Sequence, residues 1–213
     1  MQELVFQLQR RYFLARPELA QLPEAWPGQP SWFWHGEHIL ELLEVHRPIT
    51  CVELGSWRGG SAIPTARLVR QWGGTVTCVD AWNMGAGEPL WYRELNVTLG
   101  ECAKNVVAAG VSASVRFIQA GTLDAARHWK GSLIDYLYVD ADHSYEGCKA
   151  DLVAWWPHLR VGGLIAGDDY DDPRHGVTRA WDEFEVEYGQ QFEKASTLGT
   201  DPECTRLIWG VKR

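Results

Sequence analysis

The order of apolar runs between residues 48 and 188 constrains the fold more than any other feature of the sequence. Five short runs occur there, each followed by a segment of helical length: ITCVELGS, TVTCVDAW, SVRFIQAG, IDYLYVDADH and GGLIAGDDY. Because each run is apolar at successive positions, both of its faces must be covered, as in a parallel sheet between helices. The segments between and after the runs predict helices over 60–72, 92–109, 122–129, 145–158 and 176–188.

Two further strand-like runs close the chain, QFEKASTL and CTRLIWGVKR, and the turn GTDPE joins them. Such a pair predicts an antiparallel hairpin. The sequence therefore predicts an α/β fold with a Rossmann-like, doubly wound, mostly parallel seven-stranded sheet and a C-terminal antiparallel hairpin. We expect residues 48–213 to form this domain and residues 1–47 to be its N-terminal cover, with helices over 2–15 and 35–46.

The composition of the sequence limits the kinds of molecule that the protein is expected to bind. A chain of 213 residues with both charge signs spread along it is expected to fold as one domain. Its net charge of −8 argues against a nucleic-acid or anionic-membrane surface, since either would need a basic face. The five cysteines form no CxxC pair, and no signal peptide or membrane span is recognisable, so a cytoplasmic protein with reduced thiols is expected. The sequence leaves open whether the protein forms a homo-oligomer.

Acidic residues follow four of the five predicted parallel strands. In a doubly wound sheet, ligands bind outside the carboxyl ends of the strands, so side chains at those ends are candidates for chemistry. The third strand instead ends at Gly121. The acids at the strand ends are Glu53, Asp80, Asp140, Asp142, Asp168 and Asp169.

The stretch GLIAGDDYDDPRHG places two carboxylates side by side at the end of an apolar run. Adjacent carboxylates repel unless solvent or a cation compensates them, so the stretch is either a solvated acidic turn or part of a metal site. We expect Asp171 and Asp172 to be solvated turn residues and His175 to be exposed to solvent.

The turn VELGSWRGGS places three glycines where the first strand gives way to a helix. Glycines there allow a sharp bend and a close ligand approach, although the spacing is not the G-x-G-x-x-G pattern of dinucleotide-binding proteins. Asp80, at the end of the second strand, is placed either to accept both hydroxyls of a ribose or to cap the structure that follows.

Taken together, VELGSWRGGS, VTCVDAW, DYLYVDADHSYEG and GGLIAGDDY resemble the class I S-adenosylmethionine-dependent methyltransferases. The resemblance covers about residues 48–185. Within that class the motifs look like the metal-dependent O-methyltransferases, with catechol O-methyltransferase as a distant relative. The pattern VDADHSYEG…GDDY is most similar to the branch that methylates sugar hydroxyls of macrolides and aminocoumarins.

This resemblance implies an enzyme that binds S-adenosylmethionine and transfers its methyl group to a small-molecule hydroxyl. It implies that the methionine part lies beside Glu53 and Gly55, that Asp80 holds the ribose, and that Gly121 and Thr122 flank the adenine. The full expected cofactor-binding set is Glu53, Gly55, Ser56, Ser61, Asp80, Ala81, Gly121, Thr122 and Asp140.

Acids at the ends of the fourth and fifth strands can reach one ion, because neighbouring strands lie about 4.8 Å apart. Three carboxylates without paired His or Cys favour a hard cation, Mg²⁺ or another of its kind, so Asp140, Asp168 and Asp169 are the predicted ligands. Asp142 is the predicted general base, and the neighbouring His143 is the alternative. A sugar or catechol hydroxyl needs such help, because it is a poor nucleophile at neutral pH.

Two other interpretations stay open. One is a methyltransferase of the same fold that uses no metal; the other, from a different class, is a nucleotide-binding or non-catalytic module.

The tryptophans fall into two groups according to the segments in which they lie. Trp155 and Trp156, in a predicted helix, are expected in the core. Tryptophans in irregular segments either pack simply within a covering loop or line an acceptor pocket under a lid formed by residues 23–34 and 82–91: Trp26, Trp32, Trp34, Trp82 and Trp91.

Overall fold

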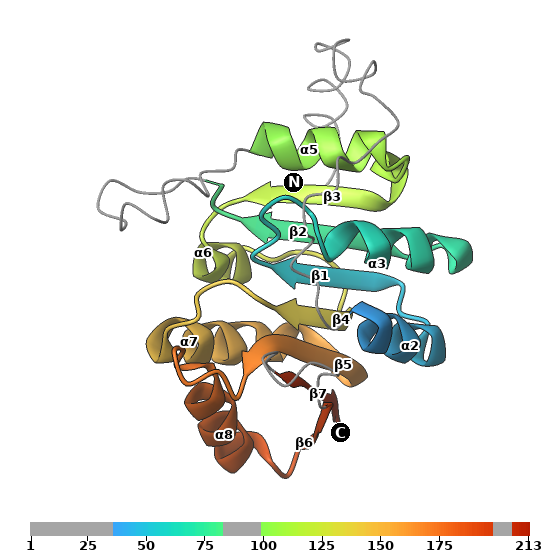
Figure 1. The fold of residues 1–213 in the computed structure, drawn as a ribbon. Coiled ribbons are helices and arrows are strands. Elements are labelled where there is room, and N and C mark those ends of the chain that lie inside the picture. The colour runs from blue at the N-terminus through green and yellow to red at the C-terminus, as the bar shows by residue number, and fades with distance from the viewer. Residues whose placement is uncertain (1–35, 83–98, 198–205) are drawn as a thin grey trace.

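The computed structural model describes residues 36–82, 99–197 and 206–213. Seven strands form one sheet in the order β3-β2-β1-β4-β5-β7-β6 (Figure 1). The fold class is therefore confirmed, including the C-terminal hairpin. The strands are β1 (Thr50–Leu54), β2 (Thr75–Asp80), β3 (Val115–Gln119), β4 (Ile134–Val139), β5 (Leu159–Tyr170), β6 (Phe192–Thr197) and β7 (Arg206–Lys212).

Strands β1 to β5 pair in parallel, so their carboxyl ends meet at one edge of the sheet (Figure 1). Strand β7 runs antiparallel to both β5 and β6. The strand order reverses at β1, which pairs with β2 on one side and with β4 on the other. This reversal opens the crevice in which a doubly wound sheet binds its ligands.

Helices cover both faces of the sheet, as the runs of apolar residues predict. One core lies under α2 (Gly36–His46), α3 (Ala62–Val69) and α5 (Leu99–Ala108). The other lies under α6 (Thr122–Arg127), α7 (Tyr145–Trp155) and α8 (Val177–Tyr188). Three short 3₁₀ helices complete the described structure: η2 (Arg70–Trp72), η3 (Ser112–Ser114) and η4 (Trp156–His158).

Strand β1 shows why both faces need cover. Cys51 packs into the first core, whereas Val52 and Leu54 pack into the second, because successive side chains of a strand point to opposite faces. Trp155 and Trp156 are buried in the second core, which confirms their predicted role. The four cysteines of the described residues are free and buried: Cys51, Cys78, Cys102 and Cys148.

The strand and helix boundaries in the structure differ from the predicted ones at several places. Strand β5 begins at Leu159 and continues through Asp168 and Asp169 to Tyr170, so the two acids lie inside the strand and not after it. Pairing with β7 extends the strand this far. The predicted helix over 2–15 and the first part of the helix over 92–109 fall outside the described residues. Among the helices that the structure describes, none is long and apolar enough to cross a membrane.

Candidate functional site

The turn after β1 lies against the end of β4, at the point where the strand order reverses. Gly55 has φ +82°, and a Cβ atom there would lie 2.0 Å from the carbonyl oxygen of Asp140. The Asp140 N–H in turn donates a 3.0 Å hydrogen bond to the Leu54 carbonyl. Glycine is therefore required at position 55 by both its backbone conformation and the available space. This contact brings the first turn and the acids after β4 together.

Glu53 is a buried carboxylate beside this turn. It is 3% exposed, and its Oε1 atom has no hydrogen-bond partner among the described residues; the same holds for the Ser56 hydroxyl. Burial raises the pKa of Glu53 to about 8, while the Ser56 and Ser61 hydroxyls act in the opposite direction. An unpaired buried carboxylate is costly, so this position suits a ligand that carries a cation or a hydrogen-bond donor.

Asp80 ends β2 and holds two loops by its side chain. Its Oδ2 atom accepts a 2.7 Å hydrogen bond from the Trp57 N–H, and its Oδ1 atom accepts one of 2.7 Å from the Trp82 N–H. Each carboxylate oxygen keeps a second lone pair with which it could accept a ribose hydroxyl. Asp80 is thus a structural anchor in any case, and both predicted roles for this residue are compatible with its geometry.

The loop after β3 lies next to Asp80. The Ala120 N–H donates to the Asp80 carbonyl at 3.0 Å, and the Gln119 side chain approaches the Ala81 carbonyl at 3.4 Å. Gly121 is exposed, and no atom lies within 4 Å of where its Cβ would be. The backbone at Gly121 is therefore open to a ligand, beside the carboxylate of the neighbouring strand.

A β-bulge places Asp168 and Asp169. Gly167 pairs with Ile208 of β7, but Tyr170 pairs with Arg206, so two residues of β5 lie opposite one residue of β7. Asp169 has φ +58°, and its N–H donates a 2.9 Å hydrogen bond to Asp168 Oδ1. A regular strand would turn adjacent side chains to opposite faces, whereas a bulge re-aims one of them.

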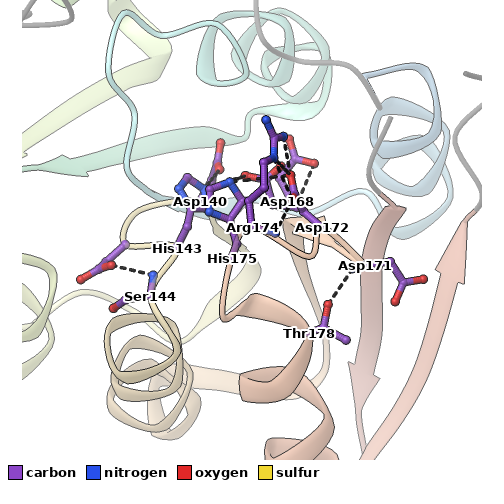
Figure 2. A network of polar contacts seen from close by, with 11 residues as sticks. Asp140, His143, Ser144, Asp168, Asp171, Asp172, Arg174, His175 and Thr178 are labelled. Atoms are coloured by element: carbon purple, nitrogen blue, oxygen red, sulfur yellow. Dashed lines mark hydrogen bonds and ion pairs between the residues drawn. The ribbon is translucent and has the colours of Figure 1, made fainter. Parts of the chain in front are cut away.

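Both acids interact electrostatically with Asp140, which follows β4, and Figure 2 shows Asp168 close to Asp140. His143 Nε2 lies 3.2 Å from Asp140 Oδ1 and 3.1 Å from Asp169 Oδ2, so one imidazole nitrogen contacts both carboxylates. Burial raises the pKa of Asp168 to about 8, and the charges of Asp140 and Asp169 act in the same direction. The predicted cluster of three carboxylates thus exists as a group of mutually repelling side chains.

His143 carries the positive charge of this cluster. Burial alone would lower its pKa, but the hydrogen bond and charge of Asp140, with the charges of Asp169 and Asp168, raise it to about 9. The imidazole is therefore protonated at neutral pH in this arrangement. It lies between Asp140 and Asp169 and partly neutralises their negative charge.

Two residues that we expected to be solvated belong to the same network. Asp172 is buried, and its carboxylate accepts hydrogen bonds from the Arg174 backbone N–H at 2.8 Å and from the Arg174 guanidinium. His175 is half-buried, its ring centroid lies 4.9 Å from that of His143, and its Nε2 atom lies 3.7 Å from Asp169 Oδ2 (Figure 2). The expectation fails because the loop folds back onto β5 and does not extend into solvent. Asp171 is exposed, as predicted.

The compact group of possible metal ligands differs from the predicted set. Within the described residues, one group of three offers ligand atoms that all lie within 4.8 Å of one another: Asp169, Asp172 and His175. It shares only Asp169 with the predicted ligands. Arg174 already pairs with Asp172 in this group and supplies the positive charge there. The bonds of Asp172 and His175 depend on loop geometry, so no sequence pattern that we recognise would have revealed them.

Asp142 lies at the start of α7 and is exposed. Its Oδ1 atom accepts a 2.8 Å hydrogen bond from the Ser144 N–H, and its side chain leaves no room for a Cβ at Gly147, which would lie 2.2 Å from Asp142 Cγ. The carboxylate is thus held by the backbone at the N-terminus of α7. One of its oxygens is not engaged by Ser144.

The hypothesis that tryptophans line an acceptor pocket can be checked at one position, Trp82. Trp82 is buried and packs edge-on against Phe117, with 5.8 Å between the two ring centroids. Its Nε1–H donates a 2.8 Å hydrogen bond to the Trp57 carbonyl. This tryptophan therefore belongs to the core, contrary to the pocket-lining hypothesis. The other tryptophans of that hypothesis, and the lid over 23–34 and 83–91, lie outside the described residues.

Comparison with known proteins agrees with this geometry. A family described as a methyltransferase domain matches residues 52–170, more than half of the chain. The fold is similar to that of an O-methyltransferase from Bacillus cereus in complex with SAH, at a TM-score of 0.65 and 20% identity over 96% of this chain and 90% of that one. It is also similar to the O-methyltransferase TomG from Streptomyces achromogenes, involved in tomaymycin synthesis and bound to SAM, with a TM-score of 0.64 and 18% identity over 96% and 88% of the two chains.

A third similar structure is that of a putative caffeoyl-CoA O-methyltransferase from Staphylococcus aureus. Its TM-score is 0.62, with 15% identity over 99% of this chain and 98% of that one. These likenesses support the predicted fold, and the match over residues 52–170 supports the predicted class. The chain belongs to the methyltransferase-domain family.

Proposed function

We propose that this protein is an S-adenosylmethionine-dependent O-methyltransferase that uses a divalent cation and acts on a hydroxyl group of a small molecule, such as a sugar or a glycosylated natural product. The observation that carries the proposal is the cluster of Asp140, Asp168 and Asp169, next to a turn where the Oε1 atom of the buried Glu53 has no hydrogen-bond partner among the described residues. A donor site and an acidic acceptor site are thereby adjacent at one sheet edge.

The donor side rests on Glu53 and Asp80. The methionine part of S-adenosylmethionine carries an ammonium group, which would satisfy the unpaired Oε1 atom of Glu53. Asp80 keeps lone pairs for the ribose hydroxyls although it already accepts two backbone hydrogen bonds. Neighbours of the same fold contain SAM or SAH, as their names state. Gly55 keeps this donor site in contact with the Asp140 backbone.

The acceptor side rests on the repulsion among the acids. Asp140, Asp168 and Asp169 offer only oxygen ligands, which suits Mg²⁺ or a similar hard cation, and the raised pKa of Asp168 shows that its charge is poorly compensated. When bound, such a cation supplies positive charge that acidifies and orients the acceptor hydroxyl. Asp140, Asp168 and Asp169 would hold the cation at the β4–β5 end of the sheet.

Asp142 is the general base in this proposal. His143 is the alternative. In the ligand-free protein its pKa is raised to about 9 by the hydrogen bond and charge of Asp140 and by the charges of Asp169 and Asp168, the same acids that the proposed cation would neutralise. Asp142 is exposed, and its Oδ1 atom accepts a hydrogen bond from the Ser144 N–H. The proton of the acceptor hydroxyl would move to the Asp142 carboxylate as the methyl group arrives.

A small acceptor fits the charge of the protein better than a nucleic acid does. The net charge is −8, and the candidate edge is lined by carboxylates, which would repel a phosphate backbone. A neutral polyol or glycoside meets no such repulsion. A cation held by the acids would also attract vicinal hydroxyl groups.

Calorimetric titration tests the donor and the cation together. We expect S-adenosylhomocysteine to bind the wild-type protein and NAD not to bind, because the first turn lacks the dinucleotide spacing. Mg²⁺ should bind the EDTA-treated protein, and Asp168→Asn should weaken Mg²⁺ binding but not S-adenosylhomocysteine binding. Tight binding of NAD alone would overturn the proposal. Binding of S-adenosylhomocysteine without any cation effect would favour a metal-independent methyltransferase.

A further inference from the structure

The turn after β1 holds a tryptophan in a backbone conformation that suits smaller residues. The Gly59 N–H donates a 2.6 Å hydrogen bond to the Ser56 carbonyl, so Trp57 is the first central residue of a β-turn. Its φ is +42°. A positive φ at this turn position favours Gly, Asn or Asp, and for a bulky residue it is strained. The surrounding structure must therefore hold Trp57 in place.

Two side chains bind both polar backbone groups of Trp57. The Asp80 carboxylate accepts a 2.7 Å hydrogen bond from the Trp57 N–H, and Trp82 Nε1 donates one of 2.8 Å to the Trp57 carbonyl. Asp80 also accepts a 2.7 Å hydrogen bond from the Trp82 N–H. Each of these three residues is thus bonded to the other two, and the closed set of bonds ties the turn to the end of β2.

These ties continue into packed elements on either side. Trp82 is 5% exposed, and its ring packs edge-on against Phe117 of β3, so the indole N–H keeps a fixed direction. On the other side, Asn105 of α5 donates a 3.0 Å hydrogen bond from its side-chain amide to the Arg58 carbonyl. Both central residues of the turn are therefore held by side chains from elsewhere in the fold.

The held turn carries polar groups that await a ligand. The Ser56 hydroxyl and Oε1 of the adjacent Glu53 are buried and have no hydrogen-bond partner among the described residues. Because Ser56 opens the turn, the conformation of the turn decides where its hydroxyl lies. Backbone strain that persists beside unsatisfied polar groups is typical of a ligand site.

We propose that Trp82 is a positioning residue for the methyl donor, and that its indole N–H acts through the Trp57 carbonyl. It fixes the turn before the donor arrives, so that binding does not have to order it. The effect falls on the amino-acid part of the donor, because that part faces Glu53 and Ser56 under the proposed function, on which this inference rests. Trp82 acts through the turn and not by contact with the reacting atoms.

Calorimetry with two ligands tests this role. S-adenosylhomocysteine has the amino-acid part, whereas 5′-methylthioadenosine has the adenine and ribose without it. Trp82→Phe keeps an aromatic ring against Phe117 and removes the indole donor. We expect this variant to weaken S-adenosylhomocysteine binding about tenfold and 5′-methylthioadenosine binding by less than about threefold. Equal weakening of both ligands would indicate general loosening of the site and would overturn the inference.

A matched control and a second substitution keep the test sharp. Trp72 Nε1 also donates a 2.8 Å hydrogen bond to a backbone carbonyl, that of Pro48, before the opposite end of β1. Trp72→Phe should therefore leave both affinities unchanged, and weakening equal to that of Trp82→Phe would count against the proposal. L-3-benzothienylalanine at position 82 has sulfur in place of the N–H and keeps both rings, so it serves if Trp82→Phe folds poorly. Full affinity for S-adenosylhomocysteine without the N–H would show that Trp82 does not position the donor.

Hydrogen exchange in the ligand-free protein separates this inference from the proposed function. Trp82→Phe should speed exchange of the Trp57 and Gly59 amides, and Trp72→Phe should not. Unchanged exchange would overturn the positioning role whatever the protein binds. A wild-type protein that binds neither adenosine compound would refute the proposed function and with it the donor assignment, whereas faster exchange of these amides would still show that Trp82 holds the turn.

Discussion

The two halves of the carboxyl edge compensate their acids in different ways. On the donor half, Asp80 accepts hydrogen bonds from two backbone N–H groups, so its charge is satisfied by its own fold. On the acceptor half, Asp168 is buried beside Asp140 and Asp169, and its pKa rises to about 8 because their charges add to the effect of burial. Asp80 is thus satisfied by backbone donors, whereas Asp168 is left among like charges.

This difference separates structural acids from acids that await a partner. A carboxylate that the backbone satisfies keeps its place without a ligand, whereas a buried group of like charges needs a cation or protons. In the ligand-free arrangement, protonated His143 supplies part of that compensation. Under the proposed function, cation binding belongs to the β4–β5 half and donor binding to the β1–β2 half.

The largest expected effect is that of Asp168→Asn. If Asp168 is a cation ligand, its loss should abolish methyl transfer, and excess Mg²⁺ should restore part of the activity. Steady-state assays across a Mg²⁺ series measure this, and the affinity for S-adenosylhomocysteine serves as the control for an intact donor half. A variant with full activity in EDTA would remove the distinction between the two halves.

Asp142→Asn should lower kcat about 10²-fold or more while leaving the affinities for Mg²⁺ and donor unchanged. The amide can still accept from the Ser144 N–H but cannot take a proton, so the start of α7 should stay intact. Single-turnover rates are the measurement. Normal turnover of Asp142→Asn together with an inactive His143→Ala would show that the histidine is the base.

Asp80→Ala should weaken donor binding about tenfold or more without changing Mg²⁺ affinity. Two charge-assisted hydrogen bonds to a ribose are lost, each worth about 1.5–3 kcal/mol. Because Asp80 also holds the Trp57 and Trp82 backbones, part of this effect could arise from the loops. Asp80→Asn, which keeps one acceptor oxygen for the backbone, is the matched variant. Donor affinity that does not change in Asp80→Ala would leave this residue a purely structural anchor.

The smallest expected effect is on stability. The pKa of Asp168 is raised from 3.8 to about 8, and that of His143 from 6.5 to about 9. Groups whose pKa is raised in the folded state stabilise it below their unfolded pKa and lose that contribution as the pH rises through the folded pKa. The EDTA-treated protein should therefore become less stable between pH 7 and 9.

Mg²⁺ should offset this loss, because it pairs with the carboxylates as they ionise. We expect the Tm difference between Mg²⁺ and EDTA to be larger at pH 9 than at pH 6, by a few degrees. Asp168→Asn should reduce that pH dependence. A Tm difference that does not vary with pH would argue against a cation among these acids.

Local patterns predicted the elements well because each depends on few neighbours. The apolar runs placed the parallel strands, and Gly55 marked the turn at which β1 ends. The parallel arrangement then required that the acids after β1, β2 and β4 share one edge. For Trp82 the sequence left packing and pocket lining open, because an irregular segment gives no periodic signal of burial; in the structure this residue packs on Phe117 in the core.

The sequence by itself determined the α/β class, the methyltransferase family and the set of acids at the carboxyl edge, because periodicity and motif order are local properties. Only the tertiary structure decided how those acids meet. The bulge opposite β7 turns Asp168 and Asp169 toward Asp140, and the fold of the following loop buries Asp172 and brings His175 beside His143. These contacts join residues that are far apart in the sequence. The spacing of residues within one short segment carries no information about which other strand or loop will lie beside it.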